Sequence, residues 1–435
     1  MTISSSLSAG VAGLNANATR LAAISDNIAN SGTFGYKRAD AGFESMVISQ
    51  AQGAGVYSAG GVRASTMRLI DQRGALVGTA NALDIAISGR GMLPVAESAS
   101  LTAGLEDSAM LLTSTGSFRP DFEGSLRTES GLVLLAWLAN ADGEIPVLAR
   151  DTTAGLVPVT INSNQQAGDP TTTMSLGVNL PATQTAAGQL GDSYPLSVEY
   201  FGNLGTSETL SLSFTPTIPA SGSSNQWRMV VRDSALDGAL IGDYLLTFDA
   251  TRANGGTLLD VTTTAGGAYD PATGSIVLDV AGGPMNVTIG GLGDPNGLTQ
   301  LSDSFAPTAI TKNGSPVGNL TAVEVDEKGY INATYDTGFS RRLYQIPLVD
   351  VPNLNGLTAL NNQTYQISPD SGSFFLWNAG EGPTGSVVGY AREGSSTDVA
   401  AELTALIQTQ RAYSSNAKVI QTVDEMLQET TNIKR

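Results

Sequence analysis

The chain has 435 residues, a length that suggests two to four domains, and only 14% of its residues are charged, against about 25% in an average globular protein. Its net charge of −18 leaves no basic patch, which argues against nucleic acid or an anionic membrane surface as a partner. The absence of Cys and His excludes disulfides, thiolate nucleophiles, the usual zinc sites and histidine acid–base chemistry. We therefore expect no metal, no cofactor and no enzyme activity.

Residues 3–30 are predicted to form one helix, because apolar and small residues recur there at alternating steps of four and three. This 3.5-residue period is typical of a seam that packs against a partner helix. The segment lacks the charged start and continuous apolar run of a Sec signal, and no window is apolar enough to span a membrane. Packing within its own domain is the alternative reading of this helix. The assembly positions assigned here are Ile3, Leu7, Leu14, Leu21, Ile24 and Ile28.

Residues 33–70 are predicted to be an extended connector. The run Ser31–Lys37 breaks the helical period, and four glycines between residues 53 and 61 follow without any sustained pattern. The order of such a segment would depend on its neighbours.

Residues 71–395 are predicted to be mainly β structure, since short apolar runs alternate there with Gly, Pro and Asn turns. We expect a first β domain made from residues 71–181 and 306–395, and an inserted outer β domain at 182–305, built as a sandwich or barrel. No helical pattern intervenes, which disfavours a parallel α/β sheet. The strands predicted in the insertion are 194–200, 208–214, 226–231, 243–248, 275–280 and 285–289.

A second long helix is predicted from Ser396–Asp398, where Ser396 or Thr397 would cap it, to about residue 432. Its length, on the order of 50 Å, is unusual for a core helix and favours an assembly role. Residues 1–32 and 396–435 together would form a helical coiled-coil domain. The assembly positions assigned in this helix are Val399, Leu403, Leu406, Tyr413, Ile420 and Leu427.

No catalytic motif is found. The run Gly291–Gly297 fails the spacing of a dinucleotide loop and contains Pro295, so it is predicted to be a turn. The chain contains no P-loop and no G-x-S-x-G, and no pair of carboxylates stands out for glycosidase chemistry. A glycan-binding module at 182–305 is a remote alternative.

Both ends of the chain resemble bacterial flagellar rod and hook proteins. The front motif ends a helix in Asn-Ile-Ala-Asn (residues 27–30) and leads into Thr33–Lys37; the rear motif runs from Ser396 through Arg411–Ile420 to Leu427. Residues 81–91 resemble the start of the first β domain that rod and hook proteins share. Within the family the chain is most similar to hook proteins, because the large β insertion at 182–305 favours them over the shorter distal rod protein. The motif residues are Asn27, Asn30, Thr33, Gly35, Tyr36, Lys37, Arg411 and Asn416.

The resemblance implies a structural subunit of the flagellar hook, which self-assembles into a flexible curved tube that couples the rod to the filament and transmits torque. A distal rod protein of the same family is the alternative. The implied partners are copies of the chain, the rod, the hook cap, the hook–filament junction proteins and the flagellar type III export apparatus. The implied location is extracellular, reached without a Sec signal. The resemblance also implies terminal helices that order only on assembly. Met92-Leu93 and residues 97–110 depart from the family pattern.

Overall fold

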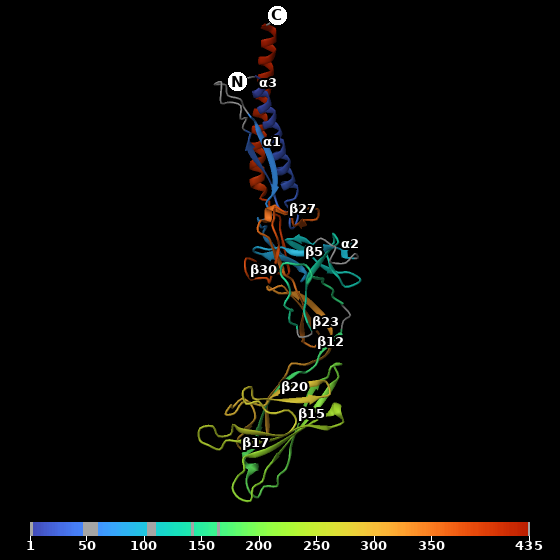
Figure 1. Cartoon of the computed structure of the whole chain (residues 1–435), viewed down its shortest axis with the longest axis vertical. Helices are drawn as coiled ribbons and strands as arrows, with labels where there is room; N and C mark the ends of the chain where they lie inside the picture. Colours follow the sequence, from blue (N-terminus) through green and yellow to red (C-terminus); the bar gives the residue numbers. More distant parts are fainter. Residues whose placement is uncertain (1–2, 47–59, 102–109, 141–142, 163–165, 434–435) are drawn as a thin grey trace. The chain divides into compact units, whose positions relative to one another are not determined.

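The computed structural model describes residues 3–46, 60–101, 110–140, 143–162 and 166–433. The chain forms two compact units. Unit 1 contains residues 1–163, 322–333 and 340–435, and unit 2 contains residues 164–321 and 334–339. The chain is mainly β, with one long helix at each end, as the sequence predicts (Figure 1).

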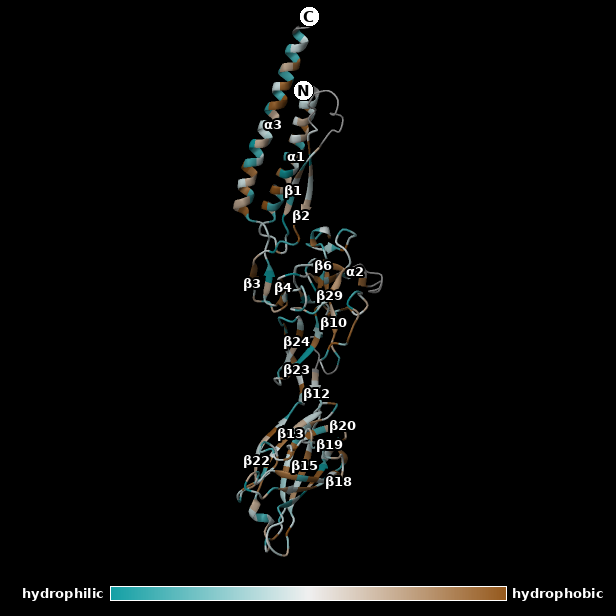
Figure 2. Cartoon of the chain, turned by 60° about the vertical axis from the view of Figure 1, so that its left-hand side comes forward, coloured by the Kyte–Doolittle hydropathy of each residue, from teal (hydrophilic) through white to brown (hydrophobic). Residues whose placement is uncertain are grey.

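The two ends of the chain form an antiparallel helix pair in unit 1. Helix α1 covers Ile3–Ala29 and helix α3 covers Val399–Ile433, and they lie side by side in Figures 1 and 2. Gly10 of α1 faces Ile420 of α3, and Gly13 faces Asn416, which fixes the antiparallel direction. Since α3 has 35 residues and α1 has 27, α3 is longer by about 12 Å.

Part of the predicted connector pairs with itself. Strand β1 (Ala39–Ser45) and strand β2 (Val62–Arg68) form an antiparallel ribbon that packs on α1, where Gly61 approaches Ala12. The glycines at 53 and 55 lie outside the described residues. The sequence did not reveal this ribbon because its side chains are mostly exposed on both faces, so no apolar alternation is needed.

The β part of unit 1 is built from short strands drawn from two distant stretches of chain. One sheet contains β24, β25, β10, β5, β6, β28 and β27 in that order, and a smaller one contains β30, β4 and β7. Trp137, Met92 and Leu376 lie in its apolar core with no exposed surface. The strands are β3 Leu76–Gly78, β4 Asp84–Ser88, β5 Leu93–Glu97, β6 Leu111–Thr113, β7 Thr115–Ser117, β8 Arg119–Pro120, β9 Leu126–Arg127, β10 Leu132–Leu138, β11 Val157–Pro158, β25 Ser340–Gln345, β26 Leu348–Asp350, β27 Thr358–Ala359, β28 Tyr365–Gln366, β29 Phe375–Trp377, β30 Ser386–Val388 and β31 Ala391–Glu393, with the short helix α2 at Ser98–Leu101.

Unit 2 consists of two sheets that share one apolar core. An antiparallel sheet runs in the order β14-β15-β16-β17-β18, and a mixed sheet runs β19-β20-β13-β21 with β22 on β13. Trp227, Tyr244 and Phe214 lie in the core without exposed surface. The strands are β12 Gln166–Asp169, β13 Thr173–Leu180, β14 Tyr194–Phe201, β15 Ser207–Pro216, β16 Gln226–Asp233, β17 Ala239–Phe248, β18 Leu258–Ala265, β19 Ser275–Val280, β20 Gly283–Thr288, β21 Thr299–Gln300 and β22 Ala306–Lys312; β23 (Ser315–Val325) and β24 (Tyr330–Tyr335) run across both units.

The bounds of unit 2 are wider than the insertion expected at 182–305. Strand β13 begins at Thr173, yet it pairs in parallel with β20 and β21 and antiparallel with β22, so it belongs to the same sheet. The six predicted strands correspond to β14–β17, β19 and β20. Strand β18 was not predicted, because its Thr-rich residues are largely exposed and show no clear alternation.

Candidate assembly site at the paired ends of the chain

In the contact between α1 and α3, glycines of α1 face Asn416 and Ile420 of α3. A Cβ atom placed on Gly13 would lie 2.9 Å from Asn416 Nδ2, and one placed on Gly10 would lie 3.1 Å from Ile420 Cγ1. The buried residues of α1 are Gly10, Gly13, Ala16, Asn17, Ala23, Ile24 and Asn27, some of them beneath the β1–β2 ribbon. Small residues let two helices approach closely but bury little apolar surface, so the pair alone is weakly stabilised.

The predicted seam overlaps this contact only in part. Ile420 contacts Gly10 and Ile24 is buried, whereas Leu403, which directly follows buried Glu402, is exposed. One residue corresponds to about 100° around a helix, so Leu403 projects to the flank. Among the predicted assembly residues, Ile24 is buried; Leu7, Leu14, Leu21, Ile28, Leu406 and Ile420 are half-buried; and Val399, Leu403, Tyr413 and Leu427 are exposed, while Ile3 begins α1.

The cap of α3 differs from the prediction. Asp398 Oδ1 accepts hydrogen bonds from the N–H groups of Ala400 (2.9 Å) and Ala401 (3.2 Å), so Asp398 is the N-cap. The Ser396 hydroxyl instead accepts from Arg38 N at 2.9 Å. The predicted cap residue therefore ties the start of α3 to the segment that follows α1.

The motif residue Asn27 joins both ends of the chain. Its Nδ2 donates to Ala39 O (2.8 Å) and to Glu402 Oε1 (3.1 Å), and its Oδ1 accepts from Ala39 N (2.8 Å). Arg38 Nε lies 3.3 Å from the same Glu402 oxygen. Asn27 thus pairs both backbone groups of Ala39, the first residue of β1, and also binds Glu402 in the first turn of α3.

Lys37 forms a buried ion pair with Glu393, just before α3. The two charges lie 2.7 Å apart with almost no exposed surface, and Lys37 Nζ also donates to Gln72 O. Burial lowers the pKa of Lys37 to about 8, although the Glu393 carboxylate opposes that shift. Arg73 lies 3.7 Å from the other Glu393 oxygen. Removing Glu393 would leave the charges of Lys37 and Arg73 without their carboxylate partner, so this carboxylate favours one arrangement of the segments that it joins.

Tyr36 and Gly35 complete this junction. The Tyr36 hydroxyl lies 2.9 Å from Asp26 Oδ2, and burial together with that carboxylate raises the pKa of Tyr36 to about 12. Gly35 has a φ of +73° and donates its N–H to Glu393 O at 2.7 Å. A side chain there would press on Thr115 at 3.0 Å, so both conformation and space favour glycine. We call Asn27, Tyr36, Lys37, Glu393 and Glu402 the polar junction.

The other motif residues have local or exposed positions. Asn30 Nδ2 donates to Asp26 O at 2.9 Å and its Oδ1 accepts from Thr33 at 3.3 Å, which closes the end of α1. Asn416 faces Gly13, whereas Arg411 is exposed. Glu393 and Glu402 were not predicted as site residues from the sequence. The signal for them was a motif lysine and a motif asparagine, which need acidic or polar partners when they are buried.

Neither a membrane span nor a metal cluster is found in the part of the chain that the structure describes. No helix there is long and apolar enough to cross a membrane. Within the same ranges, no group of three acidic side chains is arranged to hold a metal ion.

Family comparisons place both ends of the chain in one class. The family described as "Flagella basal body rod protein" matches residues 7–37, and "Flagellar basal body rod FlgEFG protein C-terminal" matches residues 388–433. These segments contain α1 with the Thr33–Lys37 break, and Glu393 with α3. The chain is therefore an axial protein of the flagellar rod and hook class.

Full-length relatives narrow the class. The flagellar hook protein FlgE of Brucella suis biovar 1 is 32% identical over 98% of both chains, and that of Rhizobium meliloti is 32% identical over 100% of both. The protein of the same name from Escherichia coli K12 is 29% identical over 98% of this chain and 99% of its own. A crystal structure of Helicobacter pylori flagellar hook protein FlgE2 aligns with 73% of this chain and 99% of that chain, at a TM-score of 0.47 and 12% identity.

The chain belongs to the flagellar hook protein family. It is a structural subunit of the flagellar hook.

Proposed function

We propose that the chain polymerises through its paired ends into the hook, a flexible curved tube that couples the rod to the filament and transmits torque. The observation that supports this is the exposed flank of α3. Its apolar side chains at residues 399, 403, 407, 413 and 427 are 38 to 51% exposed, while the contact with α1 places Ile420 and Asn416 against glycines. Figure 2 shows hydrophobic and hydrophilic residues alternating along this helix.

The energetics favour helices that order on assembly. Fully burying a Leu or Ile side chain contributes about 1.5–3 kcal/mol, so neighbouring copies that cover this flank would supply what the α1–α3 contact lacks. A helix pair held mainly by small residues is marginal in water, and ordering it costs entropy that is offset only at an interface. In this proposal the polar junction sets where the two ends meet, and neighbouring copies stabilise the helices beyond it.

The subunit would contact copies of itself, the rod, the hook cap, the hook–filament junction proteins and the export apparatus, and would act outside the cell after type III export. It would act as a structural protein and not as an enzyme, which the lack of His and Cys and the absence of any catalytic motif support.

The exposed flank is tested by paired double variants of α3. Leu403→Ser with Tyr413→Ser removes apolar surface from the predicted seam, whereas Val419→Ser with Met426→Ser removes similarly exposed surface from the opposite side, about 160° from Leu403. We expect the seam variant to raise the critical concentration for polymerisation more than tenfold, since about 1.4 kcal/mol of lost burial is a factor of ten. The control variant should change the critical concentration less than threefold. Sedimentation and electron microscopy measure the polymer that each variant forms.

The proposal fails if the seam variant polymerises like the parent or if the two double variants behave alike. Circular dichroism of the unassembled subunits checks that the β structure is intact in both. Each variant replaces two exposed residues, so loss of the β units themselves is not expected.

A further inference from the structure

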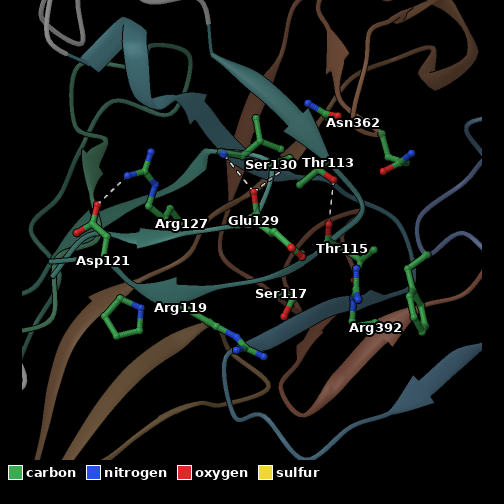
Figure 3. A pocket seen from close by; sticks show the side chains of 16 residues that line it. Thr113, Thr115, Ser117, Arg119, Asp121, Arg127, Glu129, Ser130, Asn362 and Arg392 are labelled. Atoms are coloured by element: carbon green, nitrogen blue, oxygen red, sulfur yellow. Dashed lines mark hydrogen bonds and ion pairs between the residues drawn. The ribbon is translucent and has the colours of Figure 1, made fainter. Parts of the chain in front are cut away.

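We propose that a groove lined by arginines in unit 1 binds an acidic segment of a second copy of the chain. The groove has a volume of about 890 Å³ and is bordered by β7, the β8–β9 turn, the β9–β10 turn and the β27–β28 turn (Figure 3). We call it the arginine groove. The inference rests on the proposed function, because copies must meet for the groove to be filled.

The groove is a positive site in an acidic chain. Three guanidinium groups, those of Arg119, Arg127 and Arg392, face two carboxylates, those of Asp121 and Glu129, which gives +3 − 2 = +1. The whole chain carries −18, so subunits that pack together repel one another unless their contacts place opposite charges together. An acidic segment held in this groove would turn a repulsive contact into an attractive one.

Two of the arginines have unused hydrogen-bonding capacity. Arg392 stacks on the Phe34 ring, its Cζ atom 4.2 Å from the centroid, and its buried Nε has no hydrogen-bond partner. Among the described residues Arg119 forms no ion pair, while Arg127 is held by Asp121 at 3.2 Å. Arg119, Ser117 and Arg392 all line the groove, and Ser117 is drawn between the two arginines in the view of Figure 3. A carboxylate there could accept from both.

The rim adds amide donors held in a constrained turn. Asn362 and Gln363, at the tip of the β27–β28 hairpin, both have positive φ angles, of 59° and 55°. Two consecutive non-glycine residues in this conformation cost free energy, and such strain is found at binding sites more often than elsewhere. The turn presents both side chains to the groove.

The size and surroundings of the groove favour a protein segment over a small anion. A volume of 890 Å³ falls in the range of sites that enclose drug-sized ligands, far above the size of one phosphate. Phe122, on the turn that bears Asp121, is 92% exposed. A large aromatic side chain beside an unsatisfied charged groove is typical of a protein contact. Because the chain carries 40 acidic residues, a second copy can supply the segment.

Charge reversal at the groove tests its role in assembly. Arg119→Glu reverses an exposed charge in the groove, and Arg252→Glu reverses an exposed charge in unit 2 with the same change in net charge. We expect Arg119→Glu to raise the critical concentration for polymerisation about three- to tenfold, as for the loss of one charge-assisted contact. Arg119→Lys keeps the positive charge and should polymerise nearly as well as the parent. Arg252→Glu should raise the critical concentration less than Arg119→Glu does.

Equal effects of Arg119→Glu and Arg252→Glu would overturn the inference, as would parent-like assembly of Arg119→Glu. Since Arg119 is exposed, the thermal unfolding of the unassembled subunit should be unchanged. The proposed function has an independent test in the Leu403 and Tyr413 variant, so parent-like polymerisation of Arg119→Glu would count against the groove alone.

Direct binding is tested on the unassembled full chain with a hexaglutamate peptide as probe. We expect the NMR signals of the Arg119, Arg127 and Arg392 side chains to shift while that of Arg252 stays in place. Inorganic phosphate at the same charge concentration should shift them several-fold less. The absence of shifts, equal shifts at Arg252, or equal binding of phosphate would each overturn the assignment to an acidic protein segment.

Discussion

In unit 2 the buried contacts join large residues that all belong to this unit's own stretch of chain. Tyr200 bonds to Asp233, 33 positions away, and Trp227 bonds to Gln300, 73 positions away. At the paired ends the contacts join residues 375 positions apart, as Asn27 and Glu402 show, through polar and small side chains. Closing a longer loop costs more entropy, although the cost grows slowly with length. Unit 2 can therefore fold from its own apolar core, whereas the ends depend on a few specific contacts and on neighbouring copies.

The largest expected effect comes from deleting residues 400–435. This removes α3 and Glu402 but keeps the unit 2 core, so polymerisation should be abolished while unit 2 stays folded. Electron microscopy would measure assembly, and the near-ultraviolet circular dichroism of buried Trp227 would report on unit 2. Loss of the Trp227 signal in the truncated chain would contradict this division, and a deletion of residues 1–30 should behave in the same way.

The next largest effects are expected from substitutions of single buried residues, each of which should destabilise one unit and not the other. Glu393→Ala leaves Lys37 buried and unpaired, and we expect the free energy of unfolding of unit 1 to fall by about 3–5 kcal/mol. Trp227→Ala opens a cavity in unit 2 and should lower the stability of that unit by a similar amount, about 3–5 kcal/mol. During urea unfolding, the Trp137 signal reports on unit 1 and the Trp227 signal reports on unit 2. Because Trp227→Ala removes its own reporter, unit 2 of that variant is followed by amide exchange, while Trp137 still reports on unit 1.

The control for the ion pair is Glu324→Ala, which removes a carboxylate that accepts a hydrogen bond from the exposed Tyr390 hydroxyl. It should change stability by less than about 1 kcal/mol. If Glu393→Ala were no more destabilising than Glu324→Ala, the polar junction would not hold the two ends together.

The close approach of α1 and α3 should be sensitive to size. Gly13→Leu places a large side chain against Asn416, and we expect it to destabilise the helix pair by about 1–3 kcal/mol, despite the better helix propensity of Leu. Ala22→Leu adds a Leu on the exposed side of the same helix and should be neutral or slightly stabilising. Amide exchange of α1 in the polymer measures both, and equal protection in the two variants would contradict the contact.

The structure of unit 2 could be predicted from the sequence more fully than that of the paired ends. In unit 2 the alternation of large apolar residues indicated six strands correctly, because each strand has one face in the core. At the ends the 3.5-residue period correctly predicted two helices; of its large apolar positions, Ile420 contacts Gly10, whereas Leu403 is exposed. Leu403 lies one position beyond buried Glu402, and an apolar pattern does not mark the small and polar residues that also form the contact.

Some features could not be found from sequence in any region. Glu393 lies in a short strand far from Lys37, and nothing local in the chain distinguishes it from other acidic residues. The β1–β2 ribbon has mostly exposed side chains, and the inclusion of β13 in unit 2 depends on its pairing with the distant strand β22, as between Met174 and Lys312. The arginine groove is likewise assembled from separate turns, so only the fold brings its charges together.

The smallest expected effect is a different pH dependence of the two units. In unit 1 the pKa of Lys37 falls from 10.5 to about 8, so between those values the unfolded chain binds more protons and stability should rise with pH. Tyr36 in unit 1 and Tyr244 in unit 2 both have their pKa raised by burial to about 12; for them the folded state binds more protons above pH 10, so stability should fall there. One group changes stability by at most about 1.4 kcal/mol per pH unit.

Unit 1 should therefore gain stability from pH 8 to 10 and lose it from 10 to 12, whereas the Tyr244 contribution to unit 2 only declines above pH 10. Urea unfolding at each pH, followed by Trp137 or Trp227, measures the two curves. Lys37→Met should remove the rise in unit 1, and Tyr36→Phe should reduce the later fall. If the stability of unit 2 rose equally between pH 8 and 10, buried Lys37 would not be the source of the rise in unit 1. The difference between a polar junction and an apolar core would then not explain the pH response.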